Sequence, residues 1–325
     1  MNLSTTSNAD LLRQRMLGGG PGLPPALANH PTQSSIAIDG WKSVTFGLPF
    51  FLAGVAIECA ALNTIPSHKN APDWLIALVG SFFLLAGAFL IAHGLRGVIR
   101  TVEHNRESTA HPGEPWLSDN HWNRLGSSYS AFNEMVRRLL AAIGWNAFLV
   151  PFFWVGLNQR GAGRVFLVFA SLFALLGLIF WARWARTLLD FLRHGNSTLA
   201  FDSFPYFLGG TLSARLEAPR HFDALTELAL TLRCVQEKYV TTGSGNNRST
   251  KVVCFELYKD TLSFSQGQFA GAATSSLPFS FRLPHDQSPT CLTDTPPTYW
   301  EIEARGKASG ADYEAYFLVP VYSPR

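Results

Sequence analysis

Four long apolar segments dominate the middle of the chain. They cover residues 44–65, 74–95, 139–157 and 165–184, and each approaches the roughly 20 residues that a helix needs to cross about 30 Å of hydrocarbon. Short connections make each neighbouring pair a helical hairpin. Buried helices of a soluble protein are the alternative, but such helices seldom extend this far without a charged face. The pattern predicts four transmembrane spans within residues 41–195, with a connecting loop at 96–138.

The hydrophobic period changes from 3.6 to 2 residues after Gly195. Apolar and polar residues then alternate in eight short segments, at 199–201, 212–216, 228–234, 253–257, 262–264, 277–283, 300–304 and 313–321. Regular short strands without intervening helices are typical of two packed antiparallel sheets. We therefore expect a mixed fold, in which a four-helix transmembrane bundle precedes an all-β, immunoglobulin-like sandwich over residues 196–325.

Composition fits a membrane part followed by a soluble part. The chain is 47% hydrophobic and 15% charged, which is an apolar balance for a wholly soluble protein. A net charge of +3 without a basic stripe argues against nucleic-acid binding. Residues 1–40 are rich in Gly, Pro, Ser and Thr and should form a disordered tail. They contain no cleavable signal pattern, so the first apolar segment is predicted to be a retained anchor.

Positive residues predict the orientation, because Lys and Arg near span ends are retained in the cytoplasm. The short loops carry only Lys69, Arg160 and Arg164. The loop at 96–138 and the residues just after the fourth span carry many more, namely Arg96, Arg100, Arg106, Arg124, Arg137, Arg138, Arg186 and Arg193. The N-terminus, the loop at 96–138 and the sandwich should therefore all be cytoplasmic.

Glu58 is the acidic residue that lies well inside a span. It follows Gly47 and Gly54 and precedes Ala61, which recur at seven-residue intervals, and the second span repeats this spacing at residues 80, 87 and 94. Small residues on one face let helices approach closely in lipid. At the depth of Glu58 the polar candidates are Ser81 and Ser171. A carboxyl here is a functional hypothesis, and the alternative is a protonated glutamate hydrogen-bonded between helices.

The stretch HPGEPWLSDNHW, residues 111–122, concentrates polar and aromatic groups in the loop. His111, Glu114, Asp119 and His121 are chemically able to bind a metal, but two prolines stiffen the loop and no helical His pair supports a site. We favour an interface role for His111, Glu114, Trp116 and Trp122. In this interpretation Trp116, Trp122 and Trp145 lie at the headgroup level. Residues 127–140 then form a surface-lying amphipathic helix.

Several motifs resemble a group of uncharacterised bacterial multi-pass membrane proteins with a soluble region of unknown function. They are HPGEPWL at 111–117, GWN at 144–146, LGG at 208–210, LPFSFRLP at 277–284, YWEIEA at 299–304 and GADYEAYFLVPV at 310–321. The last two are similar to the closing hairpin of arrestin-like sandwiches. Relatives often carry a soluble β domain between the first two spans, where this chain has only residues 66–73. The resemblance implies an inner-membrane location and no established reaction or cofactor.

Catalytic signatures do not appear in the sequence. It contains no GxSxG elbow, Walker loop or dinucleotide fingerprint. The four cysteines, Cys59, Cys234, Cys254 and Cys291, lack metal-ligand spacing and should be reduced and mostly buried. We expect a non-enzymatic protein without cofactor, whose sandwich binds a protein partner through an exposed sheet edge. The alternatives are a small transporter or channel component that uses Glu58, and an enzyme with its site between the loop and the sandwich.

Overall fold

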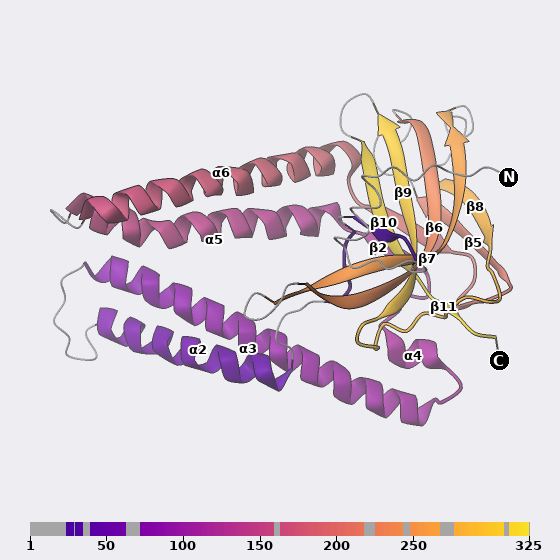
Figure 1. Ribbon diagram of the computed structural model, residues 1–325, viewed down its shortest axis with the longest axis horizontal. Helices are drawn as coiled ribbons and strands as arrows, with labels where there is room; N and C mark the ends of the chain where they lie inside the picture. The colour runs from indigo at the N-terminus through magenta and orange to yellow at the C-terminus, as the bar shows by residue number, and fades with distance from the viewer. Residues whose placement is uncertain are drawn as a thin grey trace. The chain divides into compact units, whose positions relative to one another are not determined.

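The computed structural model describes residues 24–28, 30–34, 40–62, 72–158, 163–217, 225–242, 248–266, 276–308 and 312–324. The long helices lie between residues 41 and 194, and most strands of the largely antiparallel sheets follow them, although two short strands come earlier in the chain (Figure 1). The chain forms two compact units. One contains residues 37–103 and 132–191, and the other contains 1–36, 104–131 and 192–325. We describe each unit by itself.

Four helices are long and apolar enough to cross a membrane: α2 (Trp41–Ala61), α3 (Asp73–Ala110), α5 (Ala131–Asn158) and α6 (Gly163–His194). Each contains all or most of one predicted span, and the last three continue well beyond it. Helix α3 ends just before His111 and Pro112, as the prolines predict. Helix α6 ends at His194, where Gly195 adopts a φ of 70° that favours glycine.

Helices α2 and α3 pack through their small residues, as the seven-residue spacing predicts. Gly47, Gly54 and Ala61 are buried on α2, and Gly80, Gly87 and Gly94 on α3. A Cβ added at Gly54 would lie 2.4 Å from the Leu84 backbone nitrogen, and one at Gly87 would lie 2.3 Å from the Phe51 nitrogen. The two backbones therefore meet at distances that only glycine allows, which confirms the predicted hairpin face.

Helices α5 and α6 pack through aromatic rings instead. Trp145 contacts Phe173 and Phe180 of α6, with ring centroids 5.9 and 5.3 Å apart. Its indole nitrogen donates to the Phe173 carbonyl oxygen at 3.0 Å. Both the ring and the N–H of Trp145 are therefore bound by the neighbouring helix, and its placement at the level of the lipid headgroups stays a prediction.

The β region contains a five-stranded sheet of order β1-β7-β6-β9-β10, a four-stranded sheet of order β2-β3-β5-β8, and a parallel pair, β11-β4. The strands are β1 (Ala26–Leu27), β2 (Gly126–Tyr129), β3 (Ser197–Phe201), β4 (Tyr206–Phe207), β5 (Thr211–Glu217), β6 (Leu225–Thr242), β7 (Ser249–Ser265), β8 (Ser276–Arg282), β9 (Thr298–Ala308), β10 (Tyr313–Val319) and β11 (Val321–Tyr322). Neighbours within the two larger sheets are antiparallel.

The core lies between the two larger sheets. Alternate residues of each strand point into it, including Leu230 of β6, Phe317 of β10, Trp300 of β9 and Phe281 of β8, all of which are buried. Period-2 alternation is the property of strands with one buried face, so the predicted sandwich pattern is reproduced by the sheets.

Four features predicted from the sequence differ in the structure. Residues 127–140 do not form one helix: Gly126–Tyr129 pairs with β3, and α5 begins at Ala131 and continues through Leu140 into the third apolar segment. The segments 253–257 and 262–264 form one strand, β7. Residues 104–131 belong to the sandwich unit rather than to the helical unit. Residues 26 and 27 form a strand on β7, where disorder was expected; the rest of the predicted tail, apart from residues 24–28, 30–34 and 40, lies outside the described residues.

Candidate protein-binding surface

The docking loop, residues 111–122, lies against the sandwich. A short helix, α4 (Pro115–Asp119), begins with a proline at its first position, where the fixed φ and missing N–H are tolerated. This helix presents Trp116 to two sandwich rings, Phe207 and Tyr322, with centroid distances of 5.9 Å to each. Edge-on aromatic pairs at such distances stabilise a contact beyond simple burial.

Asp119 joins the docking loop to the sandwich by hydrogen bonds. One carboxylate oxygen accepts from the backbone nitrogens of Leu292 and Thr293, at 2.6 and 3.1 Å. The other accepts from the Tyr322 hydroxyl at 3.0 Å, and that hydroxyl accepts from the Trp122 indole at 2.9 Å. Burial raises the pKa of Asp119, and these hydrogen bonds oppose the rise. Burial also raises the pKa of Tyr322, so its hydroxyl remains a donor.

The four residues weighed as metal ligands do not converge. His111 and His121 are exposed, Glu114 is half-buried at the start of α4, and Asp119 is turned toward backbone nitrogens. Among the described residues, no three His, Cys, Asp or Glu side chains are placed to hold a metal ion. All four cysteines are described and none forms a disulfide; Cys234 and Cys254 are buried, and Cys59 and Cys291 are half-buried.

Glu58 meets one of its two predicted partners. Its carboxyl oxygen accepts from the Ser81 hydroxyl of α3 at 2.6 Å. Gly80 provides the room, because a Cβ there would lie 3.0 Å from the same carboxyl oxygen. Ser171 is exposed on α6. Among the described residues, the arrangement is a hydrogen bond between two tightly packed helices.

A second segment binds the sandwich from the other end of the chain. We call residues 24–28 and 30–34 the strap. Ala26 and Leu27 pair antiparallel with Phe255 and Cys254 at the outer edge of β7, and the Glu256 nitrogen donates to the Pro25 carbonyl at 2.9 Å. Leu27 packs on a small buried cluster of Val235, Cys254 and Tyr299. This cluster lies on the face of the five-stranded sheet that is turned away from the main core.

His30 of the strap forms a buried ion pair with Glu301 of β9. Its Nε2 lies 2.6 Å from the Glu301 carboxylate, and the two side chains are 4% and 2% exposed. Its Nδ1 donates to the Pro31 carbonyl at 2.9 Å. Burial alone would lower the pKa of His30, but hydrogen bonds to Cys254 and Glu301 and the charge of Glu301 raise it to about 10. The imidazole is therefore protonated at neutral pH and donates through both nitrogens.

Glu237 of β6 receives the end of the strap. This glutamate is fully buried, and its carboxylate accepts from the backbone nitrogens of Gln33 and Ser34, at 2.5 and 2.9 Å, and from the Ser34 hydroxyl. The Tyr299 hydroxyl donates to the same carboxylate at 3.3 Å. A buried carboxylate needs such donors. The strap is thus held at three points, by Leu27, by His30 and by the backbone of residues 33 and 34.

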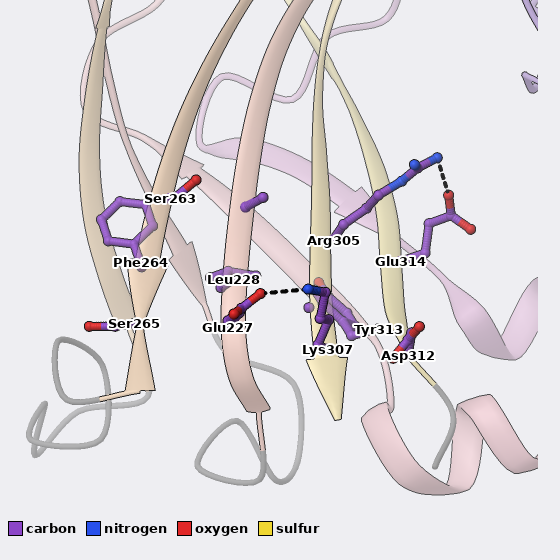
Figure 2. Close-up of a pocket in the computed structure, with 12 residues that line it drawn as sticks. Glu227, Leu228, Ser263, Phe264, Ser265, Arg305, Lys307, Asp312, Tyr313 and Glu314 are labelled. Atoms are coloured by element: carbon purple, nitrogen blue, oxygen red, sulfur yellow. Dashed lines mark hydrogen bonds and ion pairs between the residues drawn. The ribbon is translucent and has the colours of Figure 1, made fainter. Parts of the chain in front are cut away.

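A cavity of about 860 Å³ opens at one end of the same sheet (Figure 2). The lining residues come from β6, β7, β9 and β10 and from Asp312. Four of its charged groups form two pairs, Lys307 with Glu227 at 2.8 Å and Arg305 with Glu314 at 3.0 Å. These pairs are largely exposed and therefore weak. The segments 218–224, 267–275 and 309–311, which adjoin the cavity in sequence, lie outside the described residues, so we assign it no ligand.

Sequence reasoning did not identify the strap or the partners of the docking loop. Tyr322 lies 200 residues from Trp122, and nothing in either local sequence pairs them. The strap looked disordered because Pro, Gly and polar residues surround Leu27. The glutamates at 237, 301 and 303 gave a weak sign that another segment covers these strands. Charged side chains on a strand require partners when they are buried.

No family model matches the chain, and no curated protein sequence matches it either. Among solved structures, the sporulation control protein Spo0M from Bacillus subtilis is similar over 39% of this chain, with 13% sequence identity and a TM-score of 0.23. The chain spans about half, 49%, of the length of that structure. A likeness at this TM-score carries no argument about fold or function.

Proposed function

We propose that this chain is a non-enzymatic multi-pass protein of the bacterial inner membrane, whose cytoplasmic β-sandwich binds another protein. In this proposal the sandwich is arrestin-like, and the chain is a relative of the uncharacterised bacterial membrane proteins whose motifs it shares at 111–117 and 299–321.

The helical unit supports a membrane location. Large apolar side chains on its surface include Leu85, Phe89, Val168 and Leu178, which are 67, 69, 70 and 63% exposed. Such side chains require a lipid environment or another apolar cover. The excess of arginine in the loop at 96–138 and after α6 supports a cytoplasmic sandwich.

The proposed binding role rests on one observation: the β7 edge of the sandwich pairs with an extended segment of the chain. Strand β1 adds to this edge by backbone pairing, although it comes from a part of the chain more than 220 residues away. Addition of a strand to an open sheet edge is a common mode of peptide recognition. Strand β8 forms an edge of the other sheet, where β5 is its partner.

Site-specific photo-crosslinking in living cells tests the proposal with the full chain. A photoreactive residue is placed at Thr261 of β7 or at Arg282 of β8, and a matched control is placed at Leu178, which is exposed on α6. We expect a discrete protein adduct from at least one strand position and none from Leu178. Adducts from Leu178 alone, or none from either strand position, would contradict the proposal.

The transporter alternative makes a different prediction for Glu58. If this carboxyl titrates during transport, Glu58→Gln abolishes a proton- or ion-coupled flux in vesicles. A structural role predicts that Glu58→Gln keeps the hydrogen bond to Ser81 and that Glu58→Ala lowers only stability, by about 1 kcal/mol. Two observations on the described residues support the structural role: the carboxyl is hydrogen-bonded to Ser81, and the other predicted partner, Ser171, is exposed.

A further inference from the structure

Within the described residues, the strap pairs with a small part of the β7 edge. Strand β7 has 17 residues, but within the described residues β1 pairs with only two of them, Cys254 and Phe255. In this register, a strand continued on the amino-terminal side would run antiparallel along residues 257–265. A ligand longer than the strap therefore gains backbone hydrogen bonds that β1 does not make.

The side chains that the strap covers include two carboxylates. Glu237 and Glu301 are buried with the strap in place, and the partners described above for both carboxylates include strap groups. Two cations lie nearby: Arg233 already binds Glu256 at 2.7 Å and Glu303 at 2.6 Å, and the Lys238 ammonium lies over the Phe255 ring, 5.5 Å from its centroid. Without the strap, the two carboxylates become an acidic surface beside an apolar cluster and an unpaired strand edge.

We propose that this surface is a peptide-binding site, and that the strap occupies it and competes with the peptide ligand. The ligand is an extended segment of a partner protein, with an apolar residue at the Leu27 position, a cation three residues later and backbone N–H groups for Glu237 a further three residues on. This inference deepens the proposed function and rests on it. The strap functions as an autoinhibitory segment that a longer ligand displaces.

Tethering gives the strap its advantage over a short ligand. A linked segment has a local concentration on the order of millimolar, so a free peptide with the same contacts competes poorly. Weakening the strap should expose the site to a peptide added in trans.

The probe is a fluorescent synthetic peptide of residues 24–34, and fluorescence anisotropy measures its binding to the full chain in detergent or nanodiscs. Two variants release the strap: His30→Ala removes the ion pair, and Leu27→Asp places a charge in the apolar cluster. The matched control is Thr32→Ala, because Thr32 belongs to the strap and its side chain is exposed. Circular dichroism establishes that each variant is folded.

We expect the peptide to bind both release variants roughly tenfold or more tightly than the wild type and Thr32→Ala. Replacing the peptide's own histidine by alanine, or adding Glu301→Gln to the released chain, should reverse most of that gain. Equal binding to wild-type and released chains, or equal binding of a scrambled peptide, would overturn the inference. Exchange of the strap between two copies of the chain would also overturn the inference. It would show as co-purification of two differently tagged wild-type chains that is lost in His30→Ala.

A second arm uses the wild-type chain and so does not depend on the folding of a variant. A peptide with a photoreactive group at the Leu27 position, added above the millimolar range, should crosslink to the cluster of Val235, Cys254 and Tyr299 or to residues beside it. Crosslinks confined to other parts of the chain would contradict the site. The two proposals fail separately. Peptide binding without cellular adducts at Thr261 or Arg282 would count against the proposed function alone, and adducts without peptide binding would count against this site alone.

Discussion

Asp119 is the residue that fixes the docking loop to the sandwich, since it accepts hydrogen bonds from two backbone nitrogens and from Tyr322. Asp119→Ala leaves these donors without an acceptor and should lower the free energy of unfolding by about 3 kcal/mol. Asp119→Asn keeps an oxygen toward Leu292 and Thr293 and should cost about 1 kcal/mol. Thermal unfolding followed by tryptophan fluorescence measures both.

The control for Asp119 is Arg124→Ala in the same loop. Arg124 is exposed, and exposed substitutions of this kind usually change stability by less than about 0.5 kcal/mol. Equal losses for Asp119→Ala and Arg124→Ala would mean that the carboxylate does not hold the loop.

His30 makes the stability of the strap depend on pH. Its pKa is about 10 in the folded chain and 6.5 without a partner. A raised folded pKa means that the ion pair contributes fully below pH 6.5, and that its contribution is lost as the pH rises through about 10. The difference in melting temperature between the wild type and His30→Gln should therefore be largest below pH 6.5 and small above pH 10. A difference that grows with pH would contradict the ion pair.

At the scale of elements, the glycine contacts determine how closely α2 and α3 pack. Gly87→Val places a side chain against the Phe51 backbone, where even a Cβ would lie 2.3 Å from the nitrogen. The hairpin must separate, and we expect a loss of about 3 kcal/mol. Unfolding of the purified chain by increasing amounts of a denaturing detergent reports this loss.

Gly144→Ala provides a matched control for Gly87→Val. Gly144 lies inside α5, and a Cβ there has no atom within 4 Å. Removing a glycine from an open helix position should leave stability unchanged or raise it by up to about 1 kcal/mol. If both substitutions destabilise the chain equally, close helix contact at Gly87 is not the cause.

Elements with a long, regular pattern were predicted from the sequence, and short elements were not. The seven-residue glycine spacing on α2 and α3 directly encodes their contact face. Strand β2 was missed because the pattern of Tyr129, Phe132 and Val136 fits a helical face, whereas Tyr129 instead packs on the sandwich core. Strand β1 has two residues, too few to produce any period, and only its partner β7 gives it an extended conformation.

For the whole molecule, the arginine distribution predicts membrane topology. Residues 96–138 and the C-terminus should be cytoplasmic, and the loop that contains Lys69 should be on the opposite side. A fused green fluorescent protein should fluoresce after Arg325, whereas fused alkaline phosphatase should be active after Lys69 and inactive after Arg325. The reverse pattern would place the sandwich outside the cytoplasm and contradict the proposed location.

The sandwich unit is assembled from three separate parts of the sequence. Residues 196–325 alone lack the strap, β2 and the docking loop. Composition and period identified only the continuous part, because contacts such as Trp122 with Tyr322 depend on chain folding over 200 residues. A fragment that begins at residue 196 would expose the edge of β3 and the rings of Phe207 and Tyr322.

The strap also sets the order of events during synthesis. His30 is synthesised 271 residues before Glu301, and at about 5–20 residues per second this delay is on the order of 10–50 s. All four apolar helices are translated within that interval. The nascent segment must therefore wait, unbound by its final site, until β9 has been made. Closure of the strap over Glu301 therefore follows the synthesis of all four apolar helices and of β6 and β7, the other strands that the strap contacts.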